Sequence, residues 1–85
     1  MNQIDTITVT NRIRAYVLEE TFSENGKINN ETLVFKEGYF DSMGFIRLIT
    51  FLENEFGIRI SDEDLVETNF ESVNAISNFV QKRVK

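Results

Sequence analysis

The stretch that decides the fold is Phe40-Asp41-Ser42-Met43-Gly44, followed by FIRLITFLENEFGIRI at residues 45–60. Asp and Ser are preferred at the start of a helix, because their side-chain oxygens accept hydrogen bonds from free backbone N–H groups. Apolar residues then recur at steps of four, three and four, which predicts a helix over residues 42–56. Its predicted core stripe is Phe45, Ile49, Leu52 and Phe56, with Ile46 and Leu48 beside it. Gly57 is expected to end this helix, because glycine tolerates the left-handed conformation.

A first helix is predicted over residues 1–22. Its core face is Val9, Ile13, Tyr16 and Val17, with Glu20 or Thr21 continuing it. Its start is left open, because the run from Thr6 to Thr10 is rich in β-branched residues of poor helix propensity. Asp5 or one of the threonines is expected to cap it.

Two more helices are predicted in the second half of the chain. Ser61 and the acids that follow it are typical of a capped helix start, and only Leu65 and Val66 follow as core residues, so this third helix is short. The last helix is predicted to open at Glu71 or Ser72. Its stripe is Val73, Ile76, Val80 and Val84, with Phe79 beside it and Lys82, Arg83 and Lys85 at its end.

Residues 23–41 show turn signals and no sustained period, which predicts a long first loop. We expect Leu33, Phe35, Tyr39 and Phe40 to anchor it, and a turn of helix near residues 30–34 is left open. Three longer helices, one short third helix and a long first loop predict an all-α protein, a small four-helix bundle. At 85 residues the chain fits a single domain, residues 1–85.

The composition argues against several classes of function. The chain has no His and no Cys, so the commonest general base, the commonest metal ligand and every disulfide are missing. A net charge of −5 argues against a nucleic-acid partner. The acidic cluster Asp62, Glu63, Asp64 and Glu67 lacks the spacing of a calcium loop and is interpreted as a solvated helix start. No membrane span and no secretory signal are found, so we expect a cytoplasmic monomer.

The string FDSMGFIRLITFLENEFGIRIS resembles the carrier-protein family, which includes acyl and peptidyl carrier proteins. The family signature is Asp-Ser and a large aliphatic residue at the start of the second helix, here Asp41-Ser42-Met43. The resemblance continues through Glu53 to Gly57, Ile58-Arg59-Ile60, the short acidic helix from Ser61 to Leu65, and Ser72-Val73-x-x-Ile76. It covers nearly the whole chain, including the first loop.

The resemblance implies a freestanding carrier rather than an enzyme, with no catalytic residue and no metal site. It implies that a phosphopantetheinyl transferase attaches 4'-phosphopantetheine from coenzyme A to Ser42, with Asp41 in a supporting role. The arm would tether acyl or aminoacyl groups as thioesters for loading and processing enzymes. One alternative is an aminoacyl, D-alanyl or peptidyl carrier. A second is a cofactor-free helical interaction module in which Ser42 only caps the helix.

A docking face for partner enzymes is predicted beside the serine. On a helical wheel, Met43, Arg47 and Phe51 fall largely opposite the predicted core stripe. The alternative for Phe51 is packing beneath the first loop. Gly44 and Arg47 stand where acids are frequent in the carriers of fatty-acid synthesis, and this departure favours a specialised carrier for polyketide, peptide or aminoacyl transfer.

Overall fold

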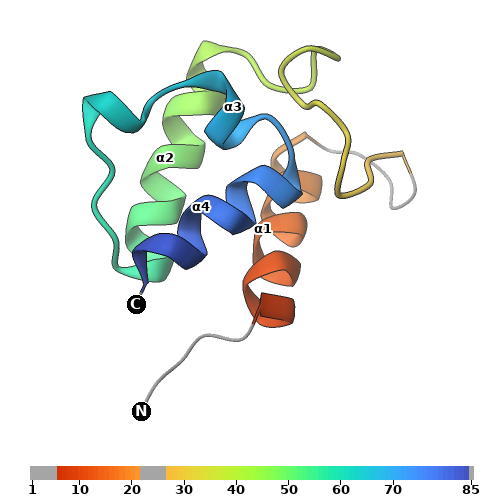
Figure 1. Cartoon of the computed structure of the whole chain (residues 1–85). Coiled ribbons are helices and arrows are strands. Elements are labelled where there is room, and N and C mark those ends of the chain that lie inside the picture. The colour runs from red at the N-terminus through yellow and green to blue at the C-terminus, as the bar shows by residue number, and fades with distance from the viewer. Residues whose placement is uncertain (1–5, 22–26, 85) are drawn as a thin grey trace.

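The computed structural model describes residues 6–21 and 27–84. Within them lie helices α1 (Thr6–Thr21), α2 (Ser42–Phe56), α3 (Glu67–Phe70) and α4 (Val73–Arg83), with a short 3-10 helix, η1 (Asp62–Asp64), before α3. The three longer helices α1, α2 and α4 form a bundle, and the short α3 packs against α4 (Figure 1). The prediction of a small all-α helical bundle is confirmed. None of the described helices is long and apolar enough to cross a membrane.

Helix α2 begins and ends where the sequence predicts. Asp41 is its N-cap, with extended backbone angles, and its side chain accepts a hydrogen bond from the Gly44 N–H. Gly57 closes the helix in the left-handed conformation, at φ 64° and ψ 33°, and its N–H donates to the carbonyl of Glu53 at 3.0 Å. Both ends are therefore fixed by local hydrogen bonds, which is why local sequence signals located them.

The buried face of α2 is centred differently from the prediction. Leu48 and Leu52 are fully buried and Gly44 is buried with them, one turn apart along one ridge. The predicted stripe residues Phe45, Ile49 and Phe56 are only partly buried and pack along the edge of the core. The structure therefore puts Leu48 at the centre of the face and leaves its expected neighbour Ile46 56% exposed.

Helix α1 includes the threonine run whose helicity the sequence left open. Val9, Ile13 and Val17 are fully buried as predicted, and Tyr16 is half-buried beside them. The threonines also meet α4 through polar contacts. The hydroxyls of Thr10 and Ser77 lie 2.8 Å apart, and the Thr6 hydroxyl donates to the Gln81 Oε1 at 2.7 Å. The predicted cap at Asp5 lies outside the described residues.

The third helix differs from the prediction in its core residues. The segment is split into η1 and α3, and Leu65 and Val66 in the connection between them are 40% and 48% exposed. Phe70, at the end of α3, is the fully buried residue of this segment instead. The prediction that Leu65 and Val66 belong to the core is wrong, because the break between the two short helices turns Phe70, and not this pair, toward the core.

Helix α4 confirms the predicted start and stripe. Ser72 is the N-cap, and its hydroxyl accepts a hydrogen bond from the Ala75 N–H at 3.1 Å. The buried apolar residues of the helix are Val73, Ile76, Phe79 and Val80, and Val84 packs partly buried just after it. Lys82 and Arg83 lie in the last turn, where cations are favourable for the helix dipole.

Candidate functional site

The first loop holds the start of α2 in place. Residues 30–38 form successive turns rather than the turn of helix considered for residues 30–34. The Val34 N–H donates to the carbonyl of Glu71 at 2.9 Å, and the Asn74 N–H donates to the carbonyl of Asn30 at 2.9 Å. The loop is therefore attached to the junction between α3 and α4.

The apolar side chains of this loop then pack into the bundle. Phe40 is buried, and Leu33, Phe35 and Tyr39 are partly buried, as expected of anchors. Ile28 and Val34 are fully buried as well, although sequence reasoning did not single them out. A buried Phe40 directly before Asp41 fixes the entry of the chain into α2.

Ser42 is the first residue of α2 and is exposed to solvent. The capping role belongs to Asp41, whose Oδ1 accepts from the Gly44 N–H at 2.8 Å. Within the described part of the chain the Ser42 side chain makes no hydrogen bond. Its hydroxyl thus lies free at the positive end of a helix dipole, near free backbone N–H groups.

Gly44 lies close against the cap. A Cβ atom at this position would lie 3.3 Å from the Asp41 Oδ1 and 3.6 Å from the Phe40 Cγ. The same carboxylate accepts the hydrogen bond from the Gly44 N–H. Because glycine has no side chain, the capping oxygen can approach the backbone closely here. Glycine at this position is therefore suited to a tight cap.

A groove of about 790 Å³ opens beside Ser42. It lies between the first loop, the start of α2 and the segment after η1, and its lining residues are Phe35, Lys36, Phe40, Asp41, Ser42, Phe45, Leu65 and Glu67. Aromatic rings make up much of the wall, while Lys36 and Glu67 add charge. Its volume is within the range of small-molecule sites. A group attached to Ser42 would have an amphipathic surface directly beside it.

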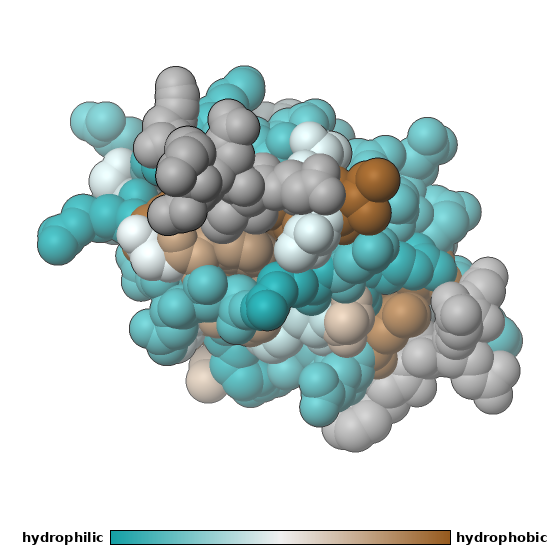
Figure 2. Space-filling model, turned by 90° about the horizontal axis from the view of Figure 1, so that it is seen from below, coloured by the Kyte–Doolittle hydropathy of each residue, from teal (hydrophilic) through white to brown (hydrophobic). Residues whose placement is uncertain are grey.

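Large apolar side chains are exposed on α2 and on the segment after η1. Met43 and Ile46 are 57% and 56% exposed on the first two turns of α2, and Leu65 and Val66 are exposed at the other side. Figure 1 shows that the start of α2 and the end of α4 lie at opposite ends of the bundle. Figure 2 shows the molecule from below, from the end opposite the start of α2, where hydrophilic side chains dominate and hydrophobic ones form small separate patches.

Two of the three predicted docking residues make contacts with α1. Arg47 is exposed, and its Nε donates to the Glu20 Oε2 at 2.5 Å, which raises the pKa of the Arg47 guanidinium. Phe51 is half-buried and stacks on Tyr16, with ring centroids 4.1 Å apart and planes 11° apart. The prediction for Phe51 is corrected: it is neither freely exposed nor packed beneath the first loop, because α1 covers this side of α2.

The stack places the Tyr16 hydroxyl in a buried position. No hydrogen bond to this oxygen is found among the described residues. Burial, followed by the nearby negative charge of Glu20, raises the pKa of the Tyr16 phenol. An ion pair between Arg12 and Glu55 also joins α1 to α2. This interface of rings and ion pairs holds α2, the helix that begins at Ser42, against α1.

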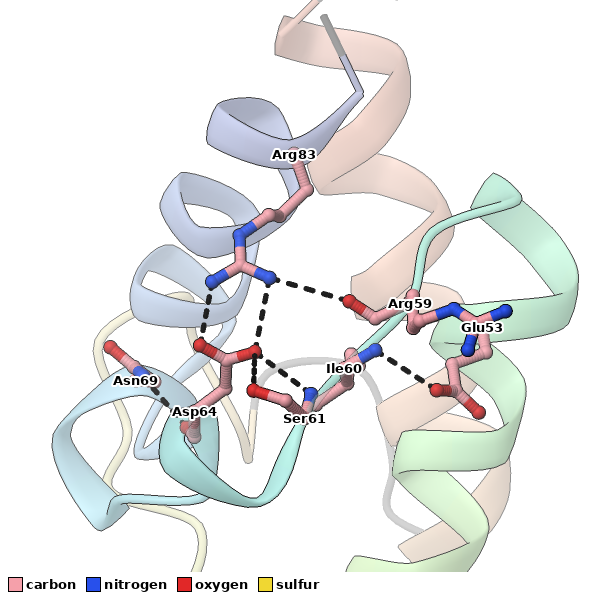
Figure 3. Close-up of polar contacts among 7 residues, drawn as sticks. All are labelled: Glu53, Arg59, Ile60, Ser61, Asp64, Asn69 and Arg83. Carbon is pink, nitrogen blue, oxygen red and sulfur yellow. Dashed lines mark hydrogen bonds and ion pairs between the residues drawn. The ribbon is translucent and has the colours of Figure 1, made fainter.

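The acidic cluster after Ser61 has a structural role around one residue, Asp64 (Figure 3). Asp64 accepts hydrogen bonds from the N–H and hydroxyl of Ser61 and from the Arg83 guanidinium. Hydrogen bonds, first of all from Arg83, lower the pKa of the Asp64 carboxyl to about 2. In the ranges 6–21 and 27–84 no group of three or more His, Cys, Asp or Glu side chains is arranged to hold a metal ion.

Neighbouring hydrogen bonds extend this network to α2 and α3. The Ile60 N–H donates to the Glu53 Oε2 at 3.0 Å, which fastens the chain after α2 back onto that helix. The Asn69 side chain donates to the Asp64 carbonyl at 2.8 Å. The far wall of the groove is therefore supported from two helices (Figure 3).

Comparisons with known proteins agree with this geometry. Residues 11–80 match the family model described as a phosphopantetheine attachment site. The chain is also 30% identical over 76 residues to the acyl carrier protein of Buchnera aphidicola subsp. Baizongia pistaciae (strain Bp). This match covers 89% of the chain and 95% of the relative.

Proposed function

Because this chain belongs to the acyl carrier protein family, whose members carry a phosphopantetheine attachment site, we propose that Ser42 is the attachment residue. Members of the family are carriers, not catalysts, and 4'-phosphopantetheine is their covalently attached cofactor. The observation that carries the proposal is the exposed Ser42 side chain at the start of α2, which makes no hydrogen bond with the described residues because Asp41 forms the cap. Because members of this family carry a cofactor, the alternative of a cofactor-free module is set aside.

The residues around Ser42 suit an anionic phosphodiester. The free N–H groups and the dipole at the start of α2 favour negative charge there. Lys36 lines the same groove and forms no ion pair with any described residue. When attached, the arm supplies the thiol that holds an acyl or aminoacyl group as a thioester. The chain needs no base of its own, because the transferase activates the hydroxyl.

Asp41 is proposed to have two functions. Its carboxylate caps α2 through Oδ1, and the exposed side chain remains accessible to a transferase and its metal ion. Carrier proteins act by meeting enzymes in turn, and we propose a transferase, a loading enzyme and processing enzymes as the partners.

Met43 is the best supported of the predicted docking residues. It follows Ser42 directly and is 57% exposed, and Ile46 extends the same exposed apolar surface. Arg47 remains accessible although it pairs with Glu20. Phe51 is proposed to act indirectly, by holding α2 against Tyr16.

The pathway is proposed from the same surface. The first turn of α2 has no acidic residue, which favours a specialised carrier for polyketide, peptide or aminoacyl transfer over one of fatty-acid synthesis. An aminoacyl, D-alanyl or peptidyl carrier remains the alternative. That the chain is one domain over residues 1–85 and a monomer of the cytoplasm stays a prediction.

The attachment is tested by incubating the protein with coenzyme A and a broad-specificity phosphopantetheinyl transferase, followed by intact-mass analysis. We expect a gain of one phosphopantetheine on the wild type and none on Ser42→Ala. Ser61→Ala is the matched control, because Ser61 is also an exposed serine at a helix start, and it should gain the group normally. An unmodified wild type, or a modified Ser42→Ala, would contradict the proposal.

A further inference from the structure

A continuous series of aromatic contacts runs from the groove into the core. Phe45 lines the groove and meets Phe35 and Phe70 edge to face, at centroid distances of 5.4 and 5.7 Å. Phe70 in turn contacts Phe79 at 5.0 Å. The series therefore begins at the solvent-exposed groove and ends on α4.

These contacts leave no open path from the groove to the interior of the bundle. Phe70 is fully buried and Phe79 is 7% exposed, so the inner rings already fill the space between α3 and α4. Rings at these distances are in van der Waals contact. Because protein interiors are packed as densely as organic crystals, an alkyl chain entering here must first part Phe45 from Phe70.

The groove presents charged side chains beside its apolar wall. Lys36, Asp41 and Glu67 line it, and Phe35, Phe40, Phe45 and Leu65 form the apolar wall. A long aliphatic chain lying in it would remain partly in water. A short acyl or an aminoacyl group would instead fit beside the charged and apolar side chains of the groove.

We infer that this carrier presents short or polar acyl and aminoacyl groups at the groove, and that Phe45 keeps long acyl chains out of the bundle. The inference rests on the proposed attachment at Ser42. It names the class of cargo, which attachment alone leaves open.

The test compares cargo of different lengths on the same protein. Wild type, Phe45→Leu and Phe45→Ala are loaded at Ser42 from acetyl-, octanoyl- and hexadecanoyl-coenzyme A by the transferase, and loading is confirmed by intact mass. Failure to load would contradict the attachment proposal, and the chain-length comparison addresses the cargo inference alone. Two quantities are then measured, the Tm and the rate at which hydroxylamine cleaves the thioester.

For the wild type we expect cleavage rates that differ by less than about twofold across chain lengths, because a thioester is protected only for the fraction of time it is buried. The Tm should not rise with length, since a chain bound only to the folded state would raise it. In Phe45→Ala the longer chains should raise the Tm above that of the acetyl form and slow cleavage, because an apolar cavity binds apolar groups. Phe45→Leu, which keeps an apolar side chain, should show the same trend more weakly.

Phe56→Ala is the matched control, because Phe56 is also a partly buried phenylalanine of α2 but contacts Phe51 rather than the groove. It should lower the Tm without adding any dependence on chain length. Protection of long chains in the wild type would overturn the inference. Phe45 variants as insensitive to chain length as Phe56→Ala would show that Phe45 is not the barrier.

Discussion

The Arg83 guanidinium and the Asp64 carboxylate are joined by two hydrogen bonds, Nη2 to Oδ1 at 2.6 Å and Nη1 to Oδ2 at 3.0 Å. Because Arg83 also donates to the Arg59 carbonyl, one side chain at the end of α4 holds both the chain after α2 and the short helix η1. The segment that forms the far wall of the Ser42 groove is fixed in this way.

Asp64→Asn is expected to remove an acid-sensitive part of the stability. The pKa of Asp64 is lowered from 3.8 to about 2 in the folded protein. Stabilisation from a lowered carboxyl pKa is complete above the unfolded value and is lost as the pH falls through this window. Wild type should therefore be more stable than Asp64→Asn at pH 7, and the difference in Tm should shrink between pH 3.8 and about 2.

Asp62→Asn is the control for net charge, because the Asp62 side chain makes no hydrogen bond with any described residue. Its Tm should follow that of the wild type over the same range of pH. If Asp62→Asn lost as much stability as Asp64→Asn, net charge rather than the pair with Arg83 would be responsible.

The capping role of Asp41 predicts opposite results for two adjacent substitutions. Asp41→Ala should lower the free energy of unfolding by about 0.5–2 kcal/mol, because the Gly44 N–H loses its partner. Ser42→Ala should change it by less than about 0.5 kcal/mol, since the exposed side chain makes no hydrogen bond with the described residues. Urea unfolding of the unmodified proteins measures both.

Asp41→Asn checks the reason for this difference. Asparagine is an equally good N-cap, so most of the stability should be retained. If Ser42→Ala lost more stability than Asp41→Ala, the assignment of the cap to Asp41 would be wrong.

The stack between Tyr16 and Phe51 predicts a measurable coupling. A double-mutant cycle with Tyr16→Ala and Phe51→Ala should give a coupling energy of about 0.5–1.5 kcal/mol beyond the area buried, as for other aromatic pairs. Tyr16→Phe should be neutral or stabilise the fold by up to about 1 kcal/mol, because it removes a buried hydroxyl for which no hydrogen bond is found among the described residues. If the two single substitutions had additive effects on the free energy of unfolding, the stack would not form in solution.

The left-handed conformation of Gly57 predicts a cost for any side chain with a Cβ atom. Gly57→Ala should destabilise the fold by about 1–2 kcal/mol, the cost of this conformation for an L-residue. Gly57→Asn should cost less, because asparagine tolerates the conformation better. Thermal unfolding of the two variants compares them, and equal stability of wild type and Gly57→Ala would contradict the prediction.

Much of the candidate site could be predicted because its signals are local. Asp41 before an apolar stripe, Gly57 after it and Ser72 before α4 act through hydrogen bonds to residues three or four positions away. The ends of α2 and the start of α4 were located from them without knowledge of the tertiary structure. The same local signals place Ser42 at the start of α2, next to the capping residue Asp41.

The residues that were left open or misplaced depend on partners far away in the chain. The threonines of α1 lie in a helix whose contacts with Ser77 and Gln81 belong to α4. Phe51 faces Tyr16 because α1 packs on that side of α2. Leu65 and Val66 look like core residues in sequence, but the break between η1 and α3 turns Phe70 inward in their place.

The sequence by itself determined the serine, its cap and the helix that follows them, because short-range hydrogen bonds and a helical period need only neighbouring residues. Only the tertiary structure decided which face of α2 is buried and which aromatic rings stand between the groove and the core. Those outcomes depend on how helices pack, since a ring such as Phe45 or Phe51 is apolar on any face and its place is decided by the helix that meets it.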